Sequence, residues 1–181
     1  MPRALIVVDI QNDYFPGGAF PLHAPELAAA NAARLLDQFR TVQESVVHIQ
    51  HVSDAPDAEF MIPGTLGVDL HDAVTPVDGE PVIQKAQPNA FLGTDLEQRL
   101  RDGGIEQLVV CGMMTSMCVD ATVRAAHDLG FAVTLAHDAC AAPNLEFGGV
   151  QVPAVSVQAA FLAPLDDSYA TVQSVDEILA D

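Results

Sequence analysis

Strand-like and helix-like segments alternate along almost the whole chain, and this alternation limits the folds that it can adopt. The run RALIVVDI at residues 3–10 is nearly all apolar and rich in β-branched residues, which is typical of a strand buried on both faces. The pattern predicts an α/β fold in three layers (α/β/α), with a mainly parallel six-stranded sheet and helices on both faces. Further strands are expected at 46–52, 82–85, 108–111, 131–135 and 170–173, and helices at 25–40, 95–102, 115–129, 153–163 and 175–179.

Length and composition suit a single domain over residues 1–181. Half of the residues are hydrophobic, which is enough for a core and argues against disorder. The formal net charge is −18, and so acidic a surface repels phosphate backbones and anionic lipids, so we expect no nucleic-acid and no membrane partner. The three cysteines form an odd set without metal-type pairing, which favours a reducing compartment, and we expect a cytoplasmic protein.

The stretch 107–130 carries the strongest signal of chemistry. Its apolar start is typical of a buried strand, Thr115 and Ser116 are good N-cap residues, and Gly130 is a typical helix stop. Cys118 therefore falls in the first turn of a helix, where unpaired N–H groups and the helix dipole favour a thiolate and can hold an oxyanion. The alternative is that Cys118 is a small buried hydrophobic residue.

Two charged residues are expected at the same edge of the sheet as this cysteine. Asp9 ends the first strand and Lys85 ends the third, and ligands of parallel α/β sheets bind beyond the carboxyl ends of the strands. With strand order 3-2-1-4-5-6, Asp9 and Cys118 are neighbours. Lys85 starts roughly 10 Å away across the sheet, so its long side chain must lean inward.

The chain resembles the isochorismatase-like cysteine hydrolases, a family that includes nicotinamidases, N-carbamoylsarcosine amidohydrolase and streptothricin hydrolase. The resemblance runs almost end to end and rests on four segments in order. These are ALIVVDIQNDYF at 4–15, PGTLGVDLH at 63–71, GEPVIQKAQPNAFLGTDL at 79–96 and GMMTSMCVDATVRAAHDLGF at 112–131.

The resemblance implies a catalytic triad of Asp9, Lys85 and Cys118 that cleaves an amide-type C–N bond of a small molecule through a thioester, without a cofactor. It also implies a cis peptide bond between Met113 and Met114, with the backbone N–H groups of Met114 and Cys118 as the oxyanion hole. Isochorismatases themselves cleave a vinyl ether and lack this cysteine, so Cys118 argues against that reaction.

Other residues near Asp9 and Lys85 in the sequence are expected to line the substrate pocket. The set is Gln11, Phe15, His51, Gln87, Asn89 and Phe91. For the two phenylalanines, ordinary core packing is an open alternative.

No metal site is expected. Nicotinamidases of this family hold a metal through an Asp-x-His pair and another His, and no Asp-x-His occurs near the candidates His48 and His51. Three residues apart on a strand, these two side chains face opposite sides and cannot readily chelate one ion. We expect His48 to lie in the core.

The remaining segments suggest how the pocket is closed and how subunits meet. The irregular stretch 53–80 is long enough to be functional or a lid. The apolar segment 150–165 suits a subunit contact, and we expect a homo-oligomer, a dimer or a tetramer. Two alternatives to the hydrolase are an inactive relative that only binds a ligand and a redox-sensing thiol protein.

Overall fold

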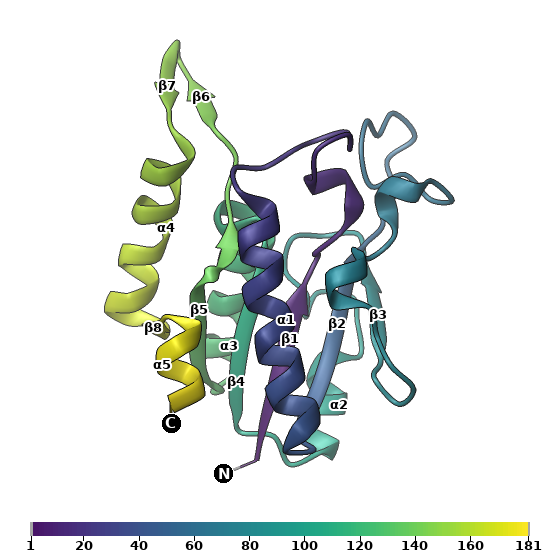
Figure 1. Cartoon of the computed structure of the whole chain (residues 1–181), viewed down its shortest axis with the longest axis vertical. Coiled ribbons are helices and arrows are strands. Elements are labelled where there is room, and N and C mark those ends of the chain that lie inside the picture. Colours follow the sequence, from purple (N-terminus) through teal and green to yellow (C-terminus); the bar gives the residue numbers. More distant parts are fainter. Residues whose placement is uncertain (1, 181) are drawn as a thin grey trace.

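The computed structural model describes residues 2–180 and contains a six-stranded sheet between two layers of helices (Figure 1). All neighbouring strands are parallel, in the order β3-β2-β1-β4-β5-β8, which confirms the predicted α/β class. This is the order that makes Asp9 and Cys118 neighbours. The strands are β1 (Arg3–Val8), β2 (Ser45–His51), β3 (Val82–Lys85), β4 (Gln107–Met113), β5 (Ala132–Ala141) and β8 (Thr171–Gln173).

Two apolar clusters lie on the two faces of the sheet. Helices α1 (Pro25–Thr41) and α5 (Val175–Ala180) contribute to one cluster, and α2 (Leu96–Asp102), α3 (Asp120–Asp128) and α4 (Ala154–Ser168) contribute to the other. Strand β1 contributes residues to both clusters, because its alternate side chains point to opposite faces of the sheet. Its continuous apolar run follows from this double burial. Within residues 2–180, no helix is both long enough and apolar enough to cross a bilayer.

The C-terminal third departs from the prediction. Strand β5 continues to Ala141 instead of ending near Leu135, so Cys140 lies within the strand. An antiparallel hairpin of β6 (Leu145–Phe147) and β7 (Val150–Val152) was not predicted, although Gly148 and Gly149 between its strands both have positive φ, as tight hairpins require. Helix α4 also continues past Pro164 instead of ending before it.

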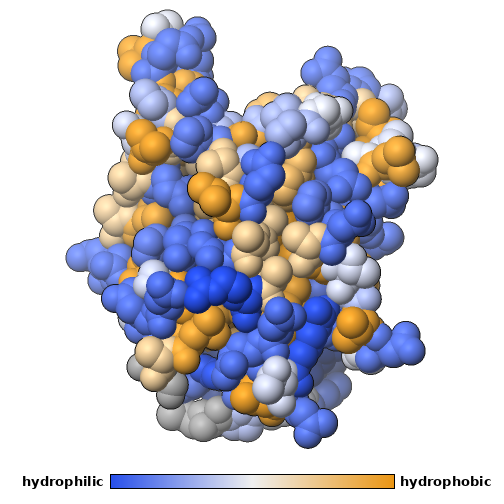
Figure 2. Space-filling model, in the orientation of Figure 1, coloured by the Kyte–Doolittle hydropathy of each residue, from blue (hydrophilic) through white to orange (hydrophobic). Residues whose placement is uncertain are grey.

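Two walls rise from the carboxyl edge of the sheet. The hairpin β6–β7 projects on one side and the segment 53–80 lies on the other, with a hollow between them (Figures 1 and 2). The second wall is fastened to the loop after β1: Gln11 forms a β-bridge with Leu70, the Asn12 N–H donates to Asp69 O at 3.0 Å, and the His71 N–H donates to Ile10 O at 2.8 Å. The middle of the 53–80 segment is therefore anchored.

Gly112 allows β4 to lie close against β1, just before both strands reach the site. It pairs with Val8 and has a φ of +134°. A Cβ atom at this position would overlap the Val8 carbonyl oxygen, so neither the space nor the backbone conformation accepts a side chain.

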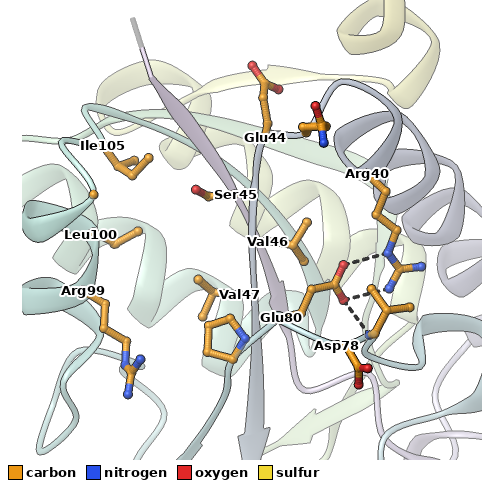
Figure 3. Close-up of a pocket in the computed structure, with 15 residues that line it drawn as sticks. Arg40, Glu44, Ser45, Val46, Val47, Asp78, Glu80, Arg99, Leu100 and Ile105 are labelled. Carbon is orange, nitrogen blue, oxygen red and sulfur yellow. Dashed lines mark hydrogen bonds and ion pairs between the residues drawn. The ribbon is translucent and has the colours of Figure 1, made fainter.

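A second structural constraint is a partly buried ionic network that joins the end of α1, the middle of β2 and the segment just before β3. Glu80 accepts hydrogen bonds from Arg40 at 2.7 and 2.8 Å and from the Val77 N–H at 3.1 Å (Figure 3). It also bonds to His48 Nε2 at 2.8 Å. Burial would raise the pKa of Glu80, but these hydrogen bonds outweigh it and lower the pKa from 4.5 to about 2. His48 therefore has a structural role, as expected for a core residue.

Replacing Gly112 by alanine should destabilise the fold by about 2–4 kcal/mol, because the added methyl group collides with β1 in a conformation that is strained for any L-residue. Chemical denaturation of the purified variant measures this loss. Gly103→Ala is the matched control, because Gly103 has an ordinary helical conformation and a Cβ there meets its nearest atom at 3.4 Å. Equal stability of both variants would contradict the prediction.

Glu80→Gln should lower the free energy of unfolding by about 2 kcal/mol at pH 7, because a charged acceptor of several hydrogen bonds is lost. Since folding lowers the pKa of Glu80, its contribution is complete above pH 4.5 and disappears as the pH falls toward 2. The stability difference from wild type should therefore shrink over that range. Glu97→Gln, which removes an exposed pair with Arg101, should change little.

Candidate active site

The side chains of Asp9, Lys85 and Cys118 meet at the carboxyl edge of the sheet. Lys85 Nζ lies 2.7 Å from Asp9 Oδ2 and 3.2 Å from Cys118 Sγ. The side chains of Asp9 and Lys85 are completely shielded from solvent, and Cys118 is 4% exposed. The lysine reaches across β2, as its expected inward lean requires. The three residues that lie far apart in the chain thus form one buried ionic cluster.

The two residues that follow β1 and β4 adopt unusual local conformations. Asp9 has a φ of +49°, in the left-handed region that few residues other than glycine adopt, while its N–H still donates to Ile49 O at 3.0 Å. Cys118 lies in a π-helical turn (η4, Thr115–Val119) that leads into α3. Such backbone departures are typical of functional sites.

The start of this turn differs from the prediction. The N-cap residue is Met114, and no side chain caps the turn. Thr115 instead donates its hydroxyl to Gln158 Oε1 of α4 at 2.8 Å, so it fastens the turn to a neighbouring helix. The predicted N-cap role of Thr115 and Ser116 is therefore wrong. The peptide bond between Met113 and Met114 is cis.

Burial has the largest effect on the pKa of the Cys118 thiol. It raises the pKa of Cys118, the charge of Asp9 raises it further, and Lys85 only partly opposes both effects. Burial also raises the pKa of Cys111 and raises that of Cys140 to about 12. Burial and the charge of Asp9 thus oppose the thiolate that the position of Cys118 in a helical turn was expected to favour, and Lys85 supports it.

Two polar groups beside the cluster are free to meet a ligand. Within residues 2–180, Asp9 Oδ1 and Ser116 Oγ have no hydrogen-bond partner. Tyr14, which the pocket prediction omitted, is 1% exposed, and burial followed by the charges of Asp9 and Cys118 raises its pKa. The Tyr14 phenol therefore lies near Asp9 and Cys118, and its raised pKa keeps it protonated as a hydrogen-bond donor. Its place in the segment 4–15, one of the four that carry the family resemblance, is the sequence feature that could have identified it.

The predicted pocket residues separate into different roles. Gln11 is buried, and its amide binds the backbone of His51 and Val68, so it orders the loop. Phe15 stacks on His71 with ring centroids 3.7 Å apart. His51 turns toward the cluster, with Nδ1 3.1 Å from Lys85 Nζ.

The three residues after β3 point in different directions. Gln87 lines a pocket of about 460 Å³ beside the end of β3, and neither Asp9 nor Cys118 lines this pocket. Asn89 accepts a hydrogen bond from the Phe91 N–H at 2.9 Å within its own turn. Phe91 stacks on Phe131, with ring centroids 6.1 Å apart, in the apolar cluster of α2 and α3. For Phe91, this contact favours core packing over a direct role in the pocket.

The donor set of this site does not fit a metal ion. Asp9, His51 and Cys118 present potential ligand atoms within 4.8 Å of one another. Lys85 Nζ, however, lies within hydrogen-bond distance of all three side chains, at 2.7 to 3.2 Å. The ammonium group fills the position that a metal would need and would repel it. His48 bonds to Glu80 instead of joining this set.

The chain has close relatives among known proteins. A model of the isochorismatase domain matches residues 3–176. The chain is 47% identical over 179 residues to the uncharacterized isochorismatase family protein YddQ of Bacillus subtilis, covering 99% of both chains. It is 37% identical over 144 residues to a streptothricin hydrolase of Streptomyces noursei, covering 76% of this chain and 49% of that protein.

The fold agrees with this relationship. A solved structure of an isochorismatase-family chain from Oleispira antarctica superimposes with a TM-score of 0.96 at 45% identity, covering 99% of this chain and 97% of the other. The sequence match and the shared fold both extend over nearly the whole chain, and the protein therefore belongs to the isochorismatase family.

Proposed function

We propose that the protein is a cysteine-dependent hydrolase that cleaves an amide-type C–N bond of a small molecule, with Asp9, Lys85 and Cys118 as its catalytic triad. One observation carries this proposal: a buried ammonium group contacts both the Asp9 carboxylate and the Cys118 sulfur. This arrangement can stabilise a thiolate at the moment it forms, next to a base that can take its proton.

The raised pKa of Cys118 shapes the first half of the reaction. The thiol proton moves to Asp9 as the sulfur attacks the substrate carbonyl carbon, so no free thiolate has to accumulate. Lys85 stabilises the developing negative charge on sulfur. The backbone N–H groups of Met114 and Cys118 are proposed to hold the carbonyl oxygen as it becomes an oxyanion.

Asp9 then serves as acid and as base in turn. It gives its proton to the leaving nitrogen, the C–N bond breaks, and the acyl group stays on Cys118 as a thioester. Asp9 next takes a proton from water, which attacks the thioester and releases the acid. The proton returns to the sulfur, and the site is restored. The unpartnered Oδ1 of Asp9 is the atom best suited to meet the water.

The relatives support the reaction class and leave the substrate open. A streptothricin hydrolase is among the proteins that match this chain, and its name specifies hydrolysis of a small molecule. A reducing compartment, such as the cytoplasm, would keep the free Cys118 thiol intact.

Two other functions are less well supported. A redox sensor needs a reactive thiolate, and the raised pKa of Cys118 opposes that role. A protein that only binds its ligand does not need a base and a buried ammonium group in contact with a thiol. Removal of the nucleophile distinguishes the hydrolase from the binding protein.

We also propose that the protein is a homo-oligomer assembled through the hairpin β6–β7 and α4. Phe147, Val150 and Val155 are 87%, 63% and 63% exposed, and apolar residues gather on this part of the surface (Figure 2). No charged residue occurs between Glu146 and Asp166. In a chain of net charge −18, a second copy can approach only where acidic groups are absent, so this surface favours self-association.

Cys118→Ala should abolish turnover while leaving the melting temperature within a few degrees of wild type, because only the sulfur atom is removed. Ammonia or amine release from a panel of small amides, N-carbamoyl compounds and streptothricin is the measurement. Cys140→Ala is the matched control and should retain activity. A folded Cys118→Ala variant with normal turnover would refute the mechanism.

Asp9→Asn should lower turnover by about 10²–10⁴-fold, because the acid and base of both steps are lost. Since Asp9 raises the pKa of Cys118 while Lys85 lowers it, the same change should shift alkylation of Cys118 by chloroacetamide toward lower pH. Site-resolved mass spectrometry of the alkylated protein measures this shift. Faster alkylation with lost turnover is expected, and an unchanged alkylation profile would remove Asp9 from contact with the thiol.

Light scattering of the wild-type protein should give a dimer or a tetramer. The double variant Phe147→Asp and Val155→Asp should be smaller, because it introduces charges into the apolar contact. Leu66→Asp is the control: Leu66 is 82% exposed, but it lies on the opposite wall of the site. A monomeric wild type would contradict the proposal.

A further inference from the structure

We propose that His51 is a positioning residue that fixes the ammonium group of Lys85 by accepting a hydrogen bond at Nδ1. The two atoms lie 3.1 Å apart. The inference rests on the proposed function, because it explains how the cation of the triad is held between its carboxylate and its nucleophile.

The inference follows from the number of hydrogen bonds that the Lys85 ammonium group can donate. An ammonium group has three donors and no acceptor. Lys85 Nζ has three neighbours at bonding distance: Asp9 Oδ2 at 2.7 Å, His51 Nδ1 at 3.1 Å and Cys118 Sγ at 3.2 Å. Because the Lys85 side chain is completely buried, each donor needs a partner inside the protein. His51 supplies the third partner. All three donors of the ammonium group are then satisfied where it lies, so it does not turn away from the sulfur to find another acceptor.

The donor-only character of lysine also decides the state of the imidazole. Nδ1 can only accept from Lys85, so the ring proton is on Nε2 and the ring is neutral. The environment of the ring also favours its neutral form. Burial and the charge of Lys85 lower the pKa of His51, and these effects outweigh the charges of Asp9 and Asp54, which raise it. The thiol of Cys118 and the phenol of Tyr14 are the other titratable groups near the cluster.

The backbone holds this imidazole in register with the lysine. His51 pairs with Lys85 at the carboxyl ends of β2 and β3. The side-chain amide of Gln11 accepts from the His51 N–H and donates to the His51 carbonyl, both at 2.8 Å. The end of β2 is thus clamped on two sides, which accounts for the buried amide of Gln11.

The experiment compares alkylation of Cys118 by chloroacetamide at pH 8 in two variants of His51. His51→Leu removes the acceptor and should slow alkylation by about tenfold, the effect of raising the thiol pKa by one unit. His51→Asn presents Oδ1 near the position of Nδ1, and alkylation should return to within about threefold of wild type. His48→Gln is the matched control on the same strand and should alkylate as wild type does.

Two outcomes would overturn the inference: wild-type alkylation in His51→Leu, or His51→Asn as slow as His51→Leu. The second would show that the ring matters for packing and not as an acceptor. If His51→Leu does not fold, nitrogen NMR of labelled wild-type protein decides the question. Nδ1 of His51 should resonate as an unprotonated ring nitrogen and should shift in Lys85→Met. A protonated Nδ1, or no shift, would refute the hydrogen bond.

The two sets of variants distinguish a wrong role for His51 from a wrong reaction mechanism. If His51 is not an anchor, its variants alkylate normally while Cys118→Ala remains inactive. If the hydrolase mechanism is wrong, a folded Cys118→Ala variant keeps its turnover, whatever the His51 variants do.

Discussion

The buried contact between Lys85 and Asp9 is the interaction on which the rest of the site depends. Two opposite charges removed from water lose hydration energy, and only close pairing with further hydrogen bonds offsets this loss. Here the ion pair measures 2.7 Å and the remaining lysine donors meet a sulfur and an imidazole nitrogen. Such a buried pair contributes little to stability by itself. Its presence is better explained by a site that must hold a positive charge next to a nucleophile.

The sheet makes this pair possible. Asp9 and Cys118 follow neighbouring parallel strands, and Gly112 allows these strands to come close where a side chain would collide with Val8. Lys85 is the last residue of β3, two strands away from β1, and spans the gap with its long side chain. The loop after β1 and the segment 53–80 are joined by backbone hydrogen bonds, so one wall of the site is held in place by the same residues that carry Asp9.

Burial gives the cluster its chemical character. It raises the pKa of Cys118, which favours the neutral thiol until, in the proposed mechanism, Asp9 takes its proton. The same burial strengthens the effect of Lys85 on a forming thiolate, because charges interact more strongly away from water. A resting thiol and an effective nucleophile are therefore compatible in one site.

The sequence alone determined the α/β class and placed Asp9, Lys85 and Cys118 at one edge of the sheet, because the apolar runs of β1 to β4 and the motifs around them are local signals, whereas the strand order was only assumed and is given by the structure. Tertiary structure decided what depends on neighbours distant in the chain. The hairpin β6–β7 and the length of β5 arise from sheet pairing, and the side-chain directions of Gln11, Phe15 and Phe91 arise from packing. The protonation of Cys118 depends on how deeply the fold buries it, and the contact of His51 with Lys85 depends on the register of β2 and β3, which no local pattern specifies.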